Sequence, residues 1–202
     1  SIILADLDAF FVSVELALRP ELSGLPCAAT GGGRGVVLSA TYPARRTGVT
    51  AGMPVAEART RCPGLTLLPA RPQAYRMCGD QLSSRAARAG GILERVSVDE
   101  AYWDVTGLVS ARWDQPADRP GQGACRWLRQ MAQARFGLTL SVGLAASKPV
   151  AKIACERGKP DGEDVVPIGE DTGFLHPLPV SALPGVGPVA ERRLAAAGVF
   201  TV

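Results

Sequence analysis

The chain has 202 residues, of which 47% are hydrophobic and 20% are charged. This composition is typical of a globular protein with a substantial core, and it excludes an intrinsically disordered chain. Lys and Arg number 22 against 19 Asp and Glu, so the formal net charge is only +3 and does not by itself indicate a nucleic-acid partner. No stretch has the continuous apolar character over about 20 residues that a membrane-spanning helix requires, so we expect no membrane partner.

The sequence holds five cysteines, which are Cys27, Cys62, Cys78, Cys125 and Cys155. Their odd number and wide spacing argue against a disulfide framework, and the absence of a C-x-x-C pair argues against structural zinc. We interpret them as small buried apolar residues and expect a reducing, cytoplasmic location. The chain begins at Ser1 and ends at Val202 directly after a helical pattern, so we expect it to be a fragment of a longer protein.

The first elements of the chain are a strand and a helix. Residues 2–5 form a short apolar run bounded by Asp6, which predicts a buried strand. Asp8 precedes the apolar segment 9–18, so we expect it to cap a largely buried helix there.

Strand and helix patterns then alternate. The apolar runs 27–29 and 36–38 flank the glycines of 31–33, which predicts a hairpin with a flexible tip. Helical patterns follow at 42–47, 54–61 and 73–89. Residues 95–105 alternate apolar and polar side chains and predict a pair of strands.

After a loop rich in Pro and Gly at 114–123, the patterns are a helix over 124–135, a strand over 139–144, a helix over 148–158 and a turn over 159–162. From about residue 165 the chain is proline-rich and contains a separate short helical unit. This mixture of elements predicts an α/β (α+β) fold.

Three acidic residues form the first candidate site. Asp6 follows a buried strand, where a lone carboxylate is costly unless it is paired or binds a cation. Asp99 and Glu100 are neighbours in a strand pattern, so they can serve one site only at a bend or hairpin turn. Two Mg²⁺ ions would relieve the repulsion among these carboxylates and could clamp both oxygens of a phosphoryl transfer. The alternative is a strand-end cap and a solvent-facing turn.

Basic residues form the second candidate site. Tyr42 and Arg45 lie three residues apart on one face of a helical turn, where phenol and guanidinium could hold phosphate oxygens. Lys148, Lys152 and Lys159 recur along a helix and the turn after it. The alternative for each of these residues is a solvated helix face.

The third candidate site is the glycine pair of Gly185-Val186-Gly187, which precedes a helical pattern. Glycines allow close approach of the backbone, and free N–H groups at a helix start favour a phosphate. Between two short helices this pattern is typical of a helix-hairpin-helix that holds a nucleic-acid backbone without reading bases. A simple turn is the alternative.

These residues occur in an ordered series of motifs across the chain. The motifs are LADLDAFF at 4–11, ATYPAR at 40–45, GMP at 52–54, SVDEAY at 97–102, SVG at 141–143 and the segment 148–162. The series resembles the Y-family translesion DNA polymerases, most closely their DNA polymerase IV (DinB-like) group. The resemblance implies a right-hand fold: a palm at 1–10 and 77–165 with a mixed or antiparallel sheet, small fingers at 11–76, and a partial helical thumb at 166–202. It also implies that the little-finger domain is absent.

The same resemblance implies roles for individual residues. Asp6, Asp99 and Glu100 match the catalytic metal-binding carboxylates, with the carbonyl of Leu7 as a further ligand, for two Mg²⁺ ions that Mn²⁺ could replace. Tyr42, Arg45 and Lys159 match contacts of the incoming triphosphate. Phe11 matches the ring that would clash with a ribose 2′-hydroxyl, with a plain core aromatic as the alternative.

The implied partners are primer–template DNA and dNTPs, with Gly185, Val186, Gly187, Lys148 and Lys152 against the DNA backbone. The implied activity is template-directed, error-prone DNA synthesis. A sliding clamp would bind through a C-terminal region outside this chain, and we expect a monomer whose DNA binding is weak and salt-sensitive. The alternative function is a catalytically silent scaffold in a repair assembly, but silent relatives lose acidic ligands, whereas this chain keeps all three.

Overall fold

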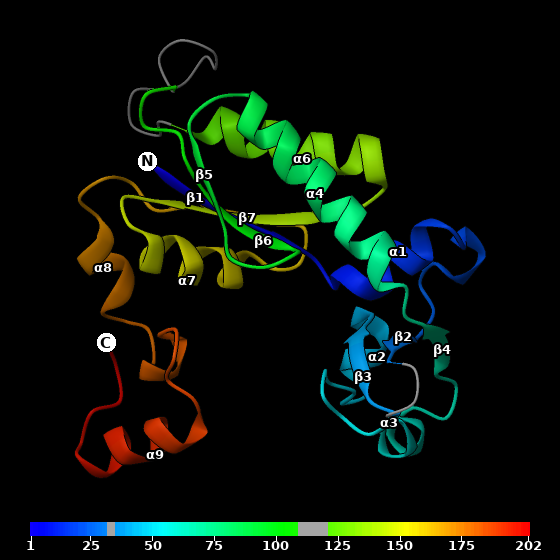
Figure 1. Cartoon of the computed structure of the whole chain (residues 1–202). Helices are drawn as coiled ribbons and strands as arrows, with labels where there is room; N and C mark the ends of the chain where they lie inside the picture. Colours follow the sequence, from blue (N-terminus) through cyan, green and yellow to red (C-terminus); the bar gives the residue numbers. More distant parts are fainter. Residues whose placement is uncertain (32–34, 109–120) are drawn as a thin grey trace.

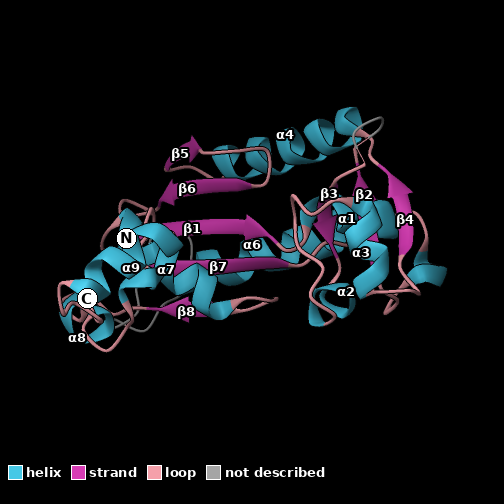
Figure 2. Cartoon of the chain, turned by 90° about the horizontal axis from the view of Figure 1, so that it is seen from below, coloured by secondary structure: helices cyan, strands magenta, loops and turns pink. Residues whose placement is uncertain are grey.

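A five-stranded sheet forms the body of the protein. The computed structural model describes residues 1–31, 35–108 and 121–202. The strands are β1 (Ile2–Leu7), β5 (Ile92–Arg95), β6 (Glu100–Asp104), β7 (Leu140–Ala145) and β8 (Glu163–Val165), and they lie in the order β5-β6-β1-β7-β8. The central strand β1 runs antiparallel to β6 and β7, and β8 runs parallel to β7, as Figure 2 shows. The sheet is therefore mixed, as predicted.

Helices cover both faces of this sheet (Figure 1). On one face lie α4 (Pro72–Arg88) and α6 (Gln122–Phe136), and on the other lies α7 (Lys148–Gly158). The side chains of β1 alternate between these layers, because successive residues of a strand point to opposite faces. Ile3 packs in the core under α4 and α6, whereas Leu4 packs with the buried residues of α7.

A second, smaller unit is built on a three-stranded sheet of β2 (Cys27–Thr30), β3 (Val37–Ala40) and β4 (Thr66–Pro69), in the order β3-β2-β4. The predicted hairpin of β2 and β3 is confirmed, while part of its tip, 32–34, lies outside the described residues. The unit also contains α2 (Tyr42–Arg46) and α3 (Val55–Arg61), and it has its own buried cluster around Val49 and Ala58.

Helix α1 (Phe10–Ala17) follows β1 and packs against β2, β3 and α4, so it joins the two units. A three-residue 3₁₀ turn, η1 (Pro20–Leu22), follows it. The prediction that Asp8 caps this helix is wrong. Ala9 takes a left-handed conformation with φ 45° at the start of the helix, and no side chain caps it. Asp8 is instead buried and accepts hydrogen bonds from elsewhere in the chain.

The C-terminal segment consists of α8 (Asp171–Leu175), the 3₁₀ turn η2 (Val180–Ala182) and α9 (Pro188–Ala196). Helix α9 follows the glycine pair as predicted, and the element before the pair is the three-residue 3₁₀ turn η2. Leu183 precedes Pro184 and is extended, because proline disfavours the helical region for the residue before it. Gly185 has φ 91°, which glycine adopts without strain, in the turn that leads to α9.

Other predicted elements agree with the structure to within a few residues, and α7 has the predicted bounds. The strand pair predicted over 95–105 is displaced: β6 lies within that range, but its partner β5 lies before it, and residues 96–99 form the connection. Most of the loop predicted at 114–123 lies outside the described residues. All five cysteines are free thiols, and four of them are buried. Among the described helices, none is both long and apolar enough to cross a bilayer.

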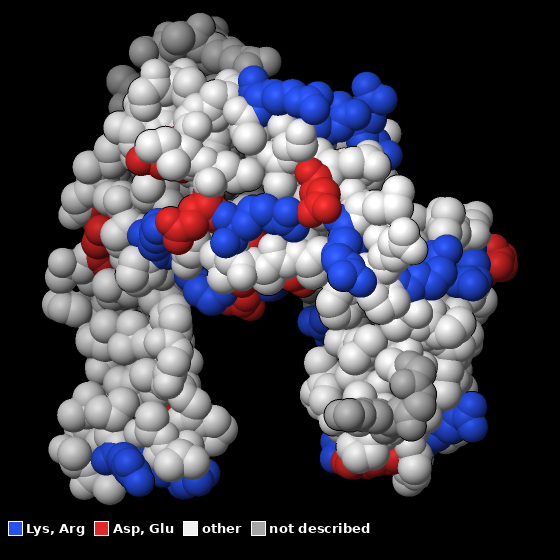
Figure 3. Space-filling view, viewed as in Figure 1, with Lys and Arg blue, Asp and Glu red and all other residues white. Residues whose placement is uncertain are grey.

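The C-terminal segment and the smaller unit extend from the same side of the larger sheet. In the view of Figure 3 they form two lobes with a hollow between them, and basic and acidic side chains gather along the body of the molecule above this hollow. The ends of β1 and β6 that carry the candidate carboxylates belong to this body.

Candidate active site

The three residues that carry the candidate carboxylates are backbone neighbours where β1 and β6 pair. Asp6 lies directly opposite Glu100 in the antiparallel register, and the Leu7 N–H donates to the Asp99 carbonyl at 3.1 Å. Asp99 and Glu100 occupy the end of the β5–β6 connection, where Ser97 Oγ accepts from their backbone N–H groups at 3.2 and 3.0 Å. The bend that would let both residues serve one site is therefore present.

Two lysines from the α7 region pair with these carboxylates. Lys159 Nζ lies 2.7 Å from Asp6 Oδ2, and Lys152 Nζ lies 2.6 Å from Glu100 Oε1. Burial raises the pKa of Asp6 to about 6, even though the hydrogen bond from Lys159 acts to lower it. At Asp6 the effect of burial on the pKa therefore outweighs that of the paired lysine.

One cavity of about 200 Å³ brings together seven of the residues that the motifs singled out. They are Asp6, Leu7, Phe11, Tyr42, Arg45, Asp99 and Lys159. They come from β1, α1, α2, the turn before β6 and the turn after α7, so residues up to 153 positions apart share one space. Glu100 lies beside this cavity, opposite Asp6, and does not line it.

Tyr42 and Arg45 project from α2 into this cavity. Thr41 caps the helix by accepting from the Ala44 N–H at 3.4 Å. Arg45 Nε donates to the Ala40 carbonyl at 2.9 Å, and its Cζ lies 4.9 Å from the centre of the Tyr42 ring. One helical turn therefore places both side chains at the wall of the same cavity.

Phe11 both packs in the core and lines the cavity. Its ring stacks on Tyr75 with centroids 4.8 Å apart and 26° between the planes. The side chain is half-buried against two core clusters, and it also lines the space that holds Asp6 and Tyr42. Phe11 is therefore a packed aromatic that also forms part of the cavity wall.

The remaining candidates, at the glycine pair and along α7, lie apart from this cavity. Lys152 and Gly185, Val186 and Gly187 line a second cavity of about 480 Å³ between α7 and the C-terminal segment. Lys148 and Glu94 form an exposed ion pair at 2.5 Å, and Lys148 lines neither cavity.

Sequence reasoning missed the part that Asp8 plays. This buried carboxylate accepts from Ser141 Oγ at 2.8 Å and from the Asp161 N–H at 2.9 Å. Arg129 also donates to the Asp161 carbonyl, and the turn that carries Lys159 contains a cis peptide before Pro160. Asp8 thereby holds the turn that directs Lys159 at Asp6. The one signal for this role of Asp8 is the partner residue Ser141 in the buried strand β7, far along the chain.

The donor chemistry of the site fits a divalent metal ion. Carboxylates such as Asp6, Asp99 and Glu100 are the oxygen ligands that hard cations prefer, and the raised pKa of Asp6 shows that this buried position lacks full compensation for a negative charge. In the part of the chain that the structure describes, no three His, Cys, Asp or Glu side chains are arranged to hold a metal ion. A metal ion would therefore compete with Lys159 and Lys152 for these carboxylates.

Comparisons with known proteins agree with this geometry. Residues 5–156 match the impB/mucB/samB family. The chain is 42% identical over 202 residues to DNA polymerase IV 2 of Mesorhizobium japonicum, covering 100% of this chain and 46% of that protein. It is 40% identical to DNA polymerase IV of Yersinia pestis, covering 99% of this chain and 56% of that protein. The chain thus spans about half the length of the curated relatives it matches.

Solved structures show the same fold. A Dbh ternary complex superimposes with a TM-score of 0.90 at 32% identity, covering 99% of this chain and 57% of that chain. DinB from Sulfolobus solfataricus superimposes with a TM-score of 0.89 at 32% identity, covering 99% and 58%. The fold is that of the palm and fingers of Y-family DNA polymerases, which confirms the resemblance of the motifs. The chain belongs to the impB/mucB/samB family.

Proposed function

We propose that this chain forms the catalytic part of a template-directed DNA polymerase of the translesion type. It adds dNTPs to a primer 3′-hydroxyl and releases pyrophosphate. The observation that supports this most is the single cavity in which Asp6 and Asp99 meet Tyr42, Arg45 and Lys159. Acidic groups on one side and phosphate-binding groups on the other are what transfer from a triphosphate requires.

Asp6, Asp99 and Glu100, with the carbonyl of Leu7, would hold the divalent ions that polymerases of this family require. We propose two Mg²⁺ ions, with Mn²⁺ as a substitute. When bound, they supply charge stabilisation for the attacking and leaving oxygens. Asp6 must be ionised to take part, and Lys159 favours that ionised form through its hydrogen bond.

Tyr42, Arg45 and Lys159 would bind the triphosphate. The Arg45 guanidinium is held at its Nε by the Ala40 carbonyl, which leaves the other nitrogens of its fork for phosphate oxygens. Lys159 would then exchange its bond to Asp6 for one to phosphate. Phe11, at the wall of the same cavity, would exclude a ribose 2′-hydroxyl by occupying its volume.

DNA would lie in the hollow between the two lobes (Figure 3). We propose a palm at 1–10 and 77–165, fingers at 11–76 and part of a thumb at 166–202, with α4 crossing from fingers to palm. Lys148, Lys152 and the backbone at Gly185, Val186 and Gly187 would contact DNA phosphates without reading bases. We further propose that the protein is a monomer in the cytoplasm and that a sliding clamp recruits it.

Two matched substitutions test this function. Glu100 and Glu94 are both bound by a lysine of α7, at 2.6 and 2.5 Å, but only Glu100 stands opposite Asp6. Primer extension with Mg²⁺, at low salt, should fall at least 100-fold in Glu100→Gln and change less than threefold in Glu94→Gln.

Equal effects of the two substitutions would overturn the assignment of the carboxylates. Absence of extension by the unaltered chain would overturn the proposed activity and favour the silent scaffold.

A further inference from the structure

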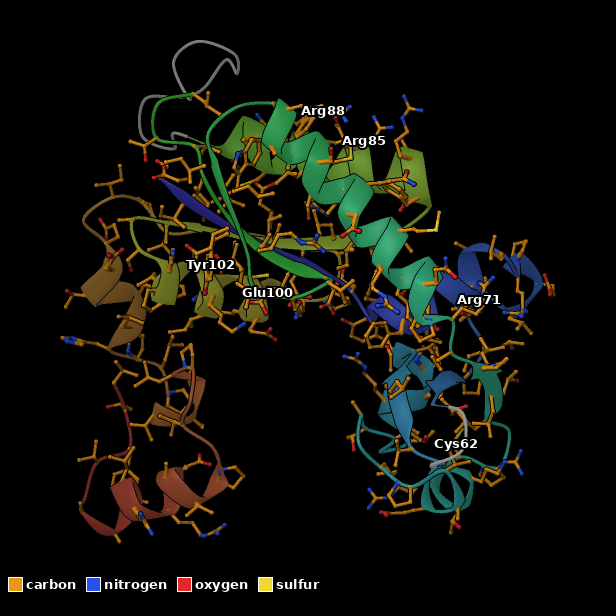
Figure 4. The ribbon with its side chains drawn as sticks, viewed as in Figure 1. Cys62, Arg71, Arg85, Arg88, Glu100 and Tyr102 are labelled. Carbon is orange, nitrogen blue, oxygen red and sulfur yellow. The ribbon has the colours of Figure 1, made fainter. Side chains whose placement is uncertain are left out.

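A fully buried carboxylate lies beneath the proposed sugar-binding wall of the cavity. The side chain of Glu15 on α1 has 0% exposure. It accepts from Arg71 Nε at 3.0 and 3.1 Å, from the Tyr75 hydroxyl at 2.9 Å and from Arg19 Nη1 at 2.9 Å. Burial alone would raise the pKa of Glu15, but these hydrogen bonds outweigh burial and lower it. Glu15 is therefore a fixed anion at the junction of α1 and α4, where Figure 4 labels Arg71.

Tyr75 connects this anion to Phe11. Phe11 and Glu15 lie one turn apart on the same face of α1, and Tyr75 of α4 touches both. Its hydroxyl donates to Glu15, while its ring, 3% exposed, stacks on the Phe11 ring at 4.8 Å. The edge of Phe10 packs on the same tyrosine at 6.1 Å.

The arrangement matters because a phenylalanine ring has no polar group of its own to fix it. Its place depends on the rings packed against it, and the hydroxyl of Tyr75 is tied to a buried charge that three donors hold. Exclusion of a single oxygen atom depends on shifts of a fraction of an ångström in such a ring. A hydrogen bond that fixes Tyr75 thus also limits the movement of Phe11.

We propose that Glu15 and Tyr75 are positioning residues for sugar selection, acting on the nucleotide through the stacked ring of Phe11. The inference rests on the proposed function of the cavity. Glu15 lines no part of that cavity, so its effect on the nucleotide is indirect. Loss of the anion or of the tyrosine hydroxyl lets the Phe11 ring move and admits ribonucleotides.

Tyr75→Phe is the sharpest test, because it removes only the hydroxyl and keeps the ring stack. We expect the ratio of kcat/KM for dNTP over rNTP to fall about tenfold, with kcat/KM for dNTP changing less than threefold. Glu15→Gln should lower the ratio in the same direction. Arg19→Gln is the control, because Arg19 is 35% exposed and bonds Oε2 of Glu15, whereas Tyr75 bonds Oε1 and Arg71 still holds both oxygens. We expect this variant to keep the original ratio.

A double substitution shows whether the effect passes through Phe11. Phe11→Leu should lower the ratio strongly, and adding Tyr75→Phe to it should produce little further change, because coupled residues are not additive. An unchanged ratio in folded Tyr75→Phe, or a full additive effect in the double variant, would overturn the proposal. If the unaltered chain incorporates no dNTP, the proposed function itself fails, and this inference fails with it.

Discussion

Gly143 of β7 lies against the backbone of α7, and one added methyl group there gives a stringent test of the packing that positions the site. A Cβ on Gly143 would lie 2.0 Å from the Ala151 carbonyl oxygen and 2.4 Å from the Cys155 nitrogen. Both atoms are backbone atoms of α7, so no side-chain rotation can relieve the contact. Gly143→Ala therefore requires α7 to move away from β7 by roughly 1 Å.

The expected loss of stability follows from this overlap. Overpacking a core commonly costs about 1–3 kcal/mol, and two backbone clashes place Gly143→Ala at about 3 kcal/mol. With a urea dependence of roughly 2 kcal/mol per molar, the unfolding midpoint should fall by about 1.5 M. Fluorescence can follow the transition, since Trp103 is fully buried beneath α4 and α6. Because Lys159 follows α7 directly, dNTP binding should weaken as well.

Gly64→Ala is the matched control. A Cβ on Gly64 meets no atom within 4 Å, and the residue does not have the positive φ that favours glycine. We expect its free energy of unfolding to stay within about 0.5 kcal/mol of the original, or to rise slightly because alanine restricts the unfolded chain. If Gly143→Ala unfolded at the same urea concentration as Gly64→Ala, the described contact between β7 and α7 would be wrong.

Two further predictions concern the acidic residues of the site. Burial raises the pKa of Asp6 to about 6, and only the ionised carboxylate binds metal. Lowering the pH from 7 to 5 should therefore weaken Mg²⁺ binding about tenfold, as measured by calorimetry. Equal affinity at both pH values would contradict this role of Asp6. Asp8→Asn removes one of the two carboxylate oxygens that accept from Ser141 and Asp161, so the free energy of unfolding should fall by about 1–3 kcal/mol. The KM for dNTP should rise several-fold, because the turn that carries Lys159 loses this support. A KM equal to that of the original chain would show that the turn holds without Asp8.

Local sequence signals predicted the elements that depend on local structure. The bounds of α7 follow from a helical pattern that ends before a Pro-Asp-Gly turn, and they agree with the structure residue for residue. The sequence also indicated that Asp99 and Glu100 could serve one site only at a bend, and the structure has such a bend there.

Sequence patterns failed where the determining partner is distant. Asp8 stands where a helix cap is expected, but its carboxylate oxygens accept hydrogen bonds from Ser141 and Asp161, which are 133 and 153 positions away. Glu15 lies in a segment predicted to be a largely buried helix, and Arg71 and Tyr75, far along the chain, donate hydrogen bonds to its buried carboxylate. No local pattern records such pairings, because they arise when distant segments of the chain meet.

The misplaced strand pair has a different cause. β5 is largely exposed, so burial imposes no alternation of apolar and polar residues on it. The alternating pattern continues through residues 96–99, where the chain turns instead of extending. Pattern alone therefore assigned the connection to a strand and overlooked the strand before it.

Counting bound metal ions tests the central proposal most directly. Electron paramagnetic resonance can titrate Mn²⁺ against the chain assembled with a dideoxy-terminated primer–template and the matching dNTP. The proposed role of Asp6, Asp99 and Glu100 as ligands of two ions predicts two bound ions per chain in this complex and fewer in Asp99→Ala. The same number of ions in both proteins, or none in the unaltered chain, would contradict a metal-dependent nucleotidyl transfer at this site.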